Sequence, residues 1–160
     1  MKRFSICLTK RALNLFLVSS FLILFVGQTP AEAGVSGLVE ATSHSGFDQT
    51  VQHLKRAVAS NGLMIITTQD QQMMLKMVGV HAHKSVGFEV FHPRFGKVIY
   101  ANDPTAYLAV PLRILVQKQG SKVEVVYLKP SVVLGEYNGL GDLGQQLDGV
   151  FERIEKEAIR

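Results

Sequence analysis

Hydrophobic and polar residues alternate most regularly in two neighbouring stretches, residues 112–118 and 122–128. Both stretches are rich in β-branched residues, and the short segment Gln119-Gly120-Ser121 separates them. Two such runs around a glycine-containing turn predict a β-hairpin. Gly120 at the first central position of the turn suits type II′ geometry, which needs a positive φ there.

The predicted hairpin has two unlike faces, because successive side chains of a strand point to opposite sides. The turn sets a register in which the opposite pairs include Val116 with Val125 and Ile114 with Tyr127. One face carries Leu112, Ile114, Val116, Val123, Val125 and Tyr127. The other face mixes apolar and polar residues, namely Arg113, Leu115, Gln117, Glu124, Val126 and Leu128. We expect the first face to lie in the core and the mixed face to be where a ligand or a partner subunit docks.

Two further stretches repeat apolar residues at the spacing of an amphipathic helix. The first runs from Phe47 to Val58 and is followed by the stop signal Asn61-Gly62. Ser45 and Asp48 before and within it fit a capping box. The second lies at the end of the chain, and its apolar positions are Leu143, Leu147, Val150, Phe151, Ile154 and Ala158.

Shorter apolar runs connect these elements. We expect strands over residues 38–41, 63–68 and 86–91, short helical segments over 70–78 and 93–100, and loops over 102–105 and 132–141. The order of elements predicts an α+β fold, in which two amphipathic helices pack on one face of a mainly antiparallel sheet of about five strands.

The first 33 residues have the three parts of a secretory signal peptide. A segment with four basic residues precedes the apolar run 12–26, and Ala31-Glu32-Ala33 forms a cleavage signal. We expect cleavage after Ala33, which leaves a single domain over residues 34–160. This domain is then periplasmic or secreted and not attached to a membrane.

Removal of the leader changes the charge and the cysteine content. The chain has 17 Lys+Arg and 13 Asp+Glu, and the leader holds four and one of these, so residues 34–160 carry 13 against 12, a net charge of +1. We therefore expect no nucleic-acid partner. The one cysteine, Cys7, lies in the leader, so the remaining domain has no disulfide and no thiol nucleophile.

Several short motifs follow one another along residues 47–130. They are His92-Pro93, Gly96, Ala106, Pro111-Leu112-Arg113, Gly120, Val123 and Tyr127-Leu128-Lys129-Pro130. In this order and spacing the segment resembles the bacterial and archaeal family known as domain of unknown function 302. The resemblance implies a compact α+β fold of the TATA-box-binding-protein-like kind. It supplies no established activity that could be carried over to this chain. Family members often carry Asp-His after the second strand and Asn-Pro after the third, whereas this chain has Asp70-Gln71 and His92-Pro93.

Arg113 on the mixed face is the main candidate for ligand recognition, because a guanidinium binds a carboxylate or phosphate through two parallel hydrogen bonds. The further candidates are Arg94, His92, Tyr127 and Asp70. The alternative is that Arg113 pairs with Glu89 or Glu124 and serves only the fold.

Histidine and methionine provide a second kind of candidate site. His81 and His83 share one face if the chain is extended, and His92 is a possible third ligand for zinc. Met73, Met74 and Met77 are soft ligands that suit copper. The alternative is that the histidines lie on an exposed loop and the methionines pack in the core.

The sequence favours an exported, non-enzymatic domain that binds a small ligand, acidic if Arg113 contacts it, or a protein partner. Homo-oligomerisation would use the same mixed face. We expect no cofactor. The G-x-G-x-x-G match at residues 139–144 would need a βαβ unit around it to bind a dinucleotide, and no strand is expected after its helix. Two alternatives remain open: a metal-binding protein for zinc or copper, and a hydrolase or isomerase with Asp70 or His92 as its acid or base.

Overall fold

Five strands pair in one sheet in the order β1-β5-β4-β3-β2, and each neighbouring pair is antiparallel. The strands are β1 (Leu38–Thr42), β2 (Met64–Asp70), β3 (Ser85–Phe91), β4 (Leu112–Gln119) and β5 (Lys122–Leu128). This computed structural model describes residues 34–160, so the predicted signal peptide, its cleavage site and Cys7 lie outside the described residues. The predicted mainly antiparallel sheet of about five strands is confirmed.

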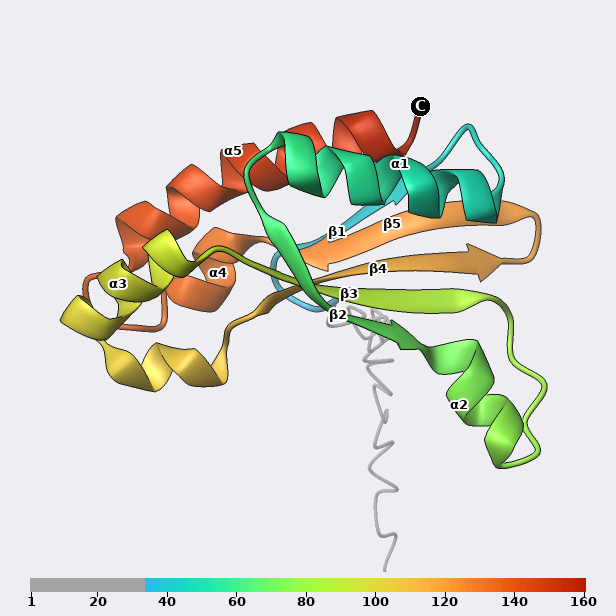
Figure 1. Ribbon diagram of the computed structural model, residues 1–160, viewed down its shortest axis with the longest axis horizontal. Coiled ribbons are helices and arrows are strands. Elements are labelled where there is room, and N and C mark those ends of the chain that lie inside the picture. The colour runs from blue at the N-terminus through green and yellow to red at the C-terminus, as the bar shows by residue number, and fades with distance from the viewer. Residues whose placement is uncertain (1–33) are drawn as a thin grey trace, which may run out of the picture. The chain divides into compact units, whose positions relative to one another are not determined.

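Two long helices cover one face of this sheet, as predicted (Figure 1). They are α1 (Phe47–Ser60) and α5 (Gly141–Ala158), and they pack against each other as well as on the strands. The fully buried side chains between these layers include Leu54, Val58, Phe88, Ile114, Val116, Val125, Phe151 and Ile154. We call this side the covered face and the opposite side the open face.

The hairpin at the centre of the sheet forms in the predicted register. Val116 lies opposite Val125, and Ile114 lies opposite Tyr127. Gly120 has a φ of 58°, as the first position of a type II′ turn requires. All six residues predicted for the core face are buried, so the alternation in this stretch was sufficient to assign its two sides.

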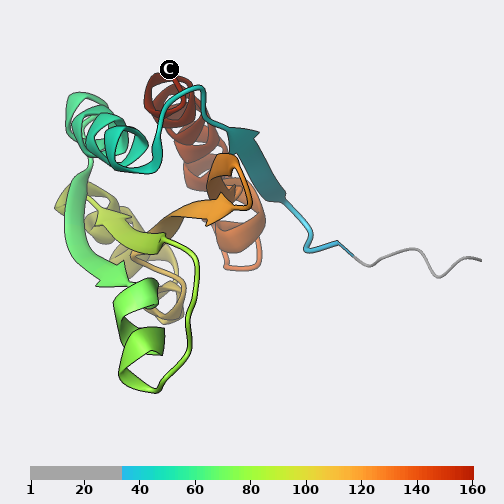
Figure 2. The same ribbon diagram turned by 90° about the vertical axis from the view of Figure 1, so that its right-hand side faces the viewer.

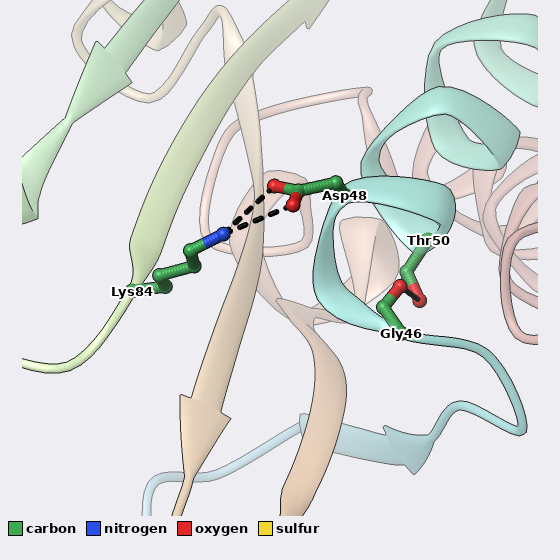
Figure 3. Close-up of polar contacts among 4 residues, drawn as sticks. All are labelled: Gly46, Asp48, Thr50 and Lys84. Atoms are coloured by element: carbon green, nitrogen blue, oxygen red, sulfur yellow. Dashed lines mark hydrogen bonds and ion pairs between the residues drawn. The ribbon is translucent and has the colours of Figure 1, made fainter.

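Helix α1 begins differently from the prediction (Figure 3). Its N-cap is Gly46, without a side-chain capping bond, and Thr50 Oγ1 donates to the Gly46 carbonyl oxygen at 3.0 Å. Ser45 is turned away and donates its hydroxyl to the Arg160 carbonyl, while Asp48 forms an ion pair with Lys84 at 3.0 Å. The predicted capping box is therefore wrong, because both of its side chains have partners that are distant in sequence.

Four shorter helical segments connect the main elements: α2 (Gln71–Met77), α3 (Pro93–Asn102), the 3₁₀ helix η1 (Pro104–Leu108) and α4 (Pro130–Leu134). The regions 102–105 and 132–141, expected as loops, are thus partly helical. Proline at the first helical position of α3, η1 and α4 supplies the φ angle that a helix start needs.

Helix α2 follows the C-terminal end of β2 and projects away from the covered face (Figures 1 and 2). Its methionines are exposed, and Met77 retains 81% of its accessible surface. The alternative that Met73, Met74 and Met77 pack in the core is therefore wrong. Gln71 and Gln72 at the start of α2 are half-buried, and the remainder of the helix is exposed.

Candidate functional site

The open face of the sheet has a cavity over strands β3, β4 and β5. The cavity has a volume of about 460 Å³. Four residues of the predicted mixed face line it: Arg113, Leu115, Val126 and Leu128. We call it the sheet hollow.

Strand register brings the floor of the sheet hollow together. Gly87 of β3 lies opposite Leu115 of β4, and Leu115 lies opposite Val126 of β5. Val126 is only 8% exposed although it faces away from the helices, and Leu115 is half-buried. The floor is therefore apolar, and Gly87 lies at its β3 edge.

Segments at opposite ends of the open face form the walls. At one end Gln71, the first residue of α2, lies over β3, where a Cβ added to Gly87 would come within 2.8 Å of Gln71 Nε2. At the other end stands the segment from Leu108 to Pro111, which leads from η1 into β4. Leu38 of β1 and Val133 of α4 complete the apolar side.

The opposite side of the sheet hollow is polar and carries an ion pair. Arg113 Nη2 donates to Glu89 Oε1 at 3.1 Å, as the register places these two residues opposite each other. Gln69 Nε2 donates to the same carboxylate oxygen at 3.2 Å. The Arg113 side chain is 76% exposed, whereas that of Glu89 is 16% exposed. The hollow thus combines an apolar floor with a polar wall.

Of the five residues predicted to bind a ligand, only Arg113 lines the sheet hollow through its side chain. Tyr127 contributes backbone there, since its buried ring points to the covered face and contacts Phe151. Its hydroxyl donates to Glu155 Oε2 at 2.9 Å. Burial, together with this hydrogen bond and the charge of Glu155, raises the pKa of Tyr127 well above its usual value. Tyr127 is not a neighbour of the Arg113 guanidinium, because the two side chains lie on opposite faces of the sheet.

The remaining three candidates, His92, Arg94 and Asp70, lie at the starts of helices. His92 is the N-cap of α3, and its Nδ1 accepts a hydrogen bond from the Arg94 backbone N–H at 3.2 Å. The Arg94 guanidinium lies over the Phe95 ring. Asp70 caps α2 by accepting from the Met73 N–H at 2.9 Å. None of the three lines the sheet hollow.

The candidate metal ligands are not gathered into a site. His81 and His83 lie on the exposed segment between α2 and β3, and His92 caps α3. Across residues 34–160, no group of three or more His, Cys, Asp or Glu side chains is placed to hold a metal ion. Over the same residues, no helix has the length and apolar character that crossing a membrane requires.

The comparisons with known proteins agree with the fold. The family model described as "Domain of unknown function DUF302" matches residues 39–157. The chain belongs to this family. The resemblance seen in residues 47–130 therefore extends over almost the whole described part of the chain.

One solved structure similar to this DUF302 chain is the crystal structure of an uncharacterized conserved DUF302 protein from Bacillus stearothermophilus. The two share 14% sequence identity with a TM-score of 0.71, over 79% of this chain and 100% of the other. At this identity the comparison supports the fold of the DUF302 domain alone. No curated protein matches the chain.

Sequence reasoning missed most of the sheet hollow in this DUF302 domain. Glu89 was considered as a partner of Arg113, but Gln69, Gln71 and Gly87 were not among the candidate site residues. Gly87 carried a usable signal, because glycine inside a strand often marks the close approach of another group. The group in question, Gln71, could not be named without the position of α2.

Proposed function

We propose that this DUF302 domain is an exported binding protein without catalytic activity, and that its ligand is a small molecule with an apolar body and an acidic group. The observation that carries the proposal is the sheet hollow itself. Its volume of about 460 Å³ lies within the range of small-molecule sites, and such sites combine apolar walls with a few placed polar groups. The leader pattern in residues 1–33 supports export.

Arg113 is the residue that would contact the acidic group. Its side chain is largely exposed, and the pair with Glu89 uses Nη2 alone among its nitrogen atoms. A guanidinium has five N–H donors, so most of them are available to an incoming carboxylate. The Glu89 contact places one nitrogen of the guanidinium at the polar wall of the hollow.

The catalytic alternative has less support. The Asp70 carboxylate and the His92 imidazole are both engaged as helix caps, and neither lines the sheet hollow. A general acid or base must reach the reacting group within hydrogen-bond distance. These two residues would act at different places on the surface, and neither place has the apolar enclosure of the hollow.

The first test is calorimetric titration with octanoate, with 1-octanol as the neutral probe of matched length. We expect octanoate to bind more tightly than octanol, and Arg113→Met to abolish that difference. Arg113→Lys should weaken octanoate binding, because the planar fork is lost while the charge stays. Lys118→Met removes an exposed charge from the same strand outside the hollow and should have no effect. Equal binding of octanoate and octanol by the unmodified protein would contradict the proposal.

The second candidate function is self-association, in which another copy of this chain covers the open face. The rim of the sheet hollow is apolar and exposed at Leu38, Leu108 and Leu128, which is an arrangement that subunit contacts use. Analytical ultracentrifugation tests it. A dimer that Leu108→Glu dissociates would support association through this face, and a monomer at every concentration would exclude it.

A further inference from the structure

We propose that the ligand of the sheet hollow is zwitterionic: it carries an ammonium or similar cationic donor beside its acidic group, as an amino acid or short peptide with an apolar side chain does. This inference rests on the proposed function and specifies its ligand class. The observation that motivates it is the carboxylate of Glu89, which lies in the wall of the hollow next to Arg113.

Glu89 has unused capacity to accept hydrogen bonds. Both of its donors, Gln69 Nε2 and Arg113 Nη2, contact the same oxygen, Oε1. No residue in the described part of the chain donates to Oε2. A carboxylate has about four acceptor positions. The Glu89 side chain is 16% exposed, and its Oε2 is accessible from solvent. The open oxygen therefore favours a ligand that brings its own donor.

The same carboxylate disfavours a ligand that is only an anion. The opposite charges of Glu89 and Arg113 lie 3.1 Å apart. A lone anion that binds Arg113 is also repelled by Glu89, so its net attraction is smaller than Arg113 alone would give. A ligand with adjacent positive and negative groups can meet both partners with the correct sign.

The other walls agree with this ligand class. Gln71 accepts a hydrogen bond from Ser85 Oγ through its Oε1, and within residues 34–160 its Nε2 donates to no protein group. That Nε2 lies over Gly87 in the wall of the hollow and is a further donor for a carboxylate. Leu115 and Val126 in the floor would receive an apolar side chain.

The test compares three probes with the same eight-carbon skeleton: 2-aminooctanoate, octanoate and octylamine. Calorimetry on the unmodified protein should show 2-aminooctanoate binding at least about tenfold more tightly than either of the others, since one added charge-assisted hydrogen bond is worth that much. Glu89→Gln should reduce this preference over octanoate to about twofold or less. Glu124→Gln, a change on the same face but outside the hollow, should leave the preference intact.

Each other outcome overturns a defined statement. If octanoate binds as tightly as 2-aminooctanoate, the zwitterion inference fails while the proposed binding of acidic ligands stands. If octylamine binds most tightly, both the inference and the role of Arg113 fail. If none of the three binds at millimolar concentration, the inference and the proposed function fail together. The probe comparison on the unmodified protein keeps the test decisive even if Glu89→Gln does not fold.

Discussion

The two faces of the β4–β5 hairpin come from the same two strands but meet different requirements. On the covered face, Ile114, Val116 and Val125 are at most 1% exposed and pack beneath α1 and α5. On the open face, Leu115 is half-buried and Arg113 is exposed. Within residues 34–160, the long helices α1 and α5 lie on the other side of the sheet (Figure 1). Folding therefore constrains the first row of side chains strongly. The second row is constrained weakly, so its composition can serve binding.

The largest expected effect separates the two faces within one strand. Ile114→Asp should unfold the domain, because an unpaired charge in the core costs several kcal/mol, about as much as the stability of a domain of this size. Leu115→Asp should lower the free energy of unfolding by only about 1 kcal/mol, since its carboxylate can reach water, but should abolish binding in the sheet hollow. Urea denaturation followed by circular dichroism measures both. Equal destabilisation by the two changes would contradict the assignment of the faces.

Gly144 in α5 and Gly87 in β3 allow the stability of the covered and open sides to be compared, because each is closely packed against another element. A Cβ on Gly144 of α5 would lie 2.7 Å from Ser131 Cα, a backbone atom of α4, so Gly144→Ala should cost about 1–3 kcal/mol. A Cβ on Gly87 would meet the movable end of the Gln71 side chain, so Gly87→Ala should cost less than 1 kcal/mol, roughly, and chiefly change ligand binding.

Gly149→Ala is the matched control for these changes. Gly149 is also in α5, but an added Cβ would have only the Arg153 side chain near it, at 3.7 Å. This change should stabilise the domain by up to about 1 kcal/mol through helix propensity alone. Thermal melts of the three variants rank them, and a Gly87→Ala variant less stable than Gly144→Ala would reverse the expected order.

The pH dependence tests the covered face at Tyr127. Its pKa is raised in the folded state, so the neutral phenol contributes stability that is fully present below the usual tyrosine pKa near 10 and is lost as the pH rises above it. Tyr127→Phe should cost about 1 kcal/mol at pH 7, because the hydrogen bond to Glu155 is lost. The variant should also lose less stability than the unmodified protein between pH 9 and pH 11, roughly. Parallel alkaline profiles for the two proteins would contradict this account.

The smallest effect is expected for the ion pair of the open face. Arg113→Met should lower the free energy of unfolding by about 1 kcal/mol or less, because one partner of the pair is largely exposed. The same change should remove recognition of the acidic group. Denaturation and titration of one preparation distinguish the two roles, and a loss of several kcal/mol would make Arg113 a structural residue.

The sequence by itself determined the elements whose signals are local. Alternation placed the six core residues of β4 and β5 on one side, and Gly120 set the turn and therefore the register. Helical spacing located α1 and α5, because an apolar stripe that repeats every three to four residues can be buried only along one side of a helix. These patterns need no knowledge of distant residues.

Tertiary structure decided everything that depends on which elements become neighbours. The pairing of β3 with β4 places Glu89 beside Arg113, and the position of α2 places Gln71 over Gly87. Ser45 was expected to cap a helix but bonds to the carbonyl of Arg160 instead. Such contacts are selected by the burial of the whole core, and one strand or one cap contains too little information to specify them. The sheet hollow belongs to this second group, since its floor and walls come from six separate parts of the chain.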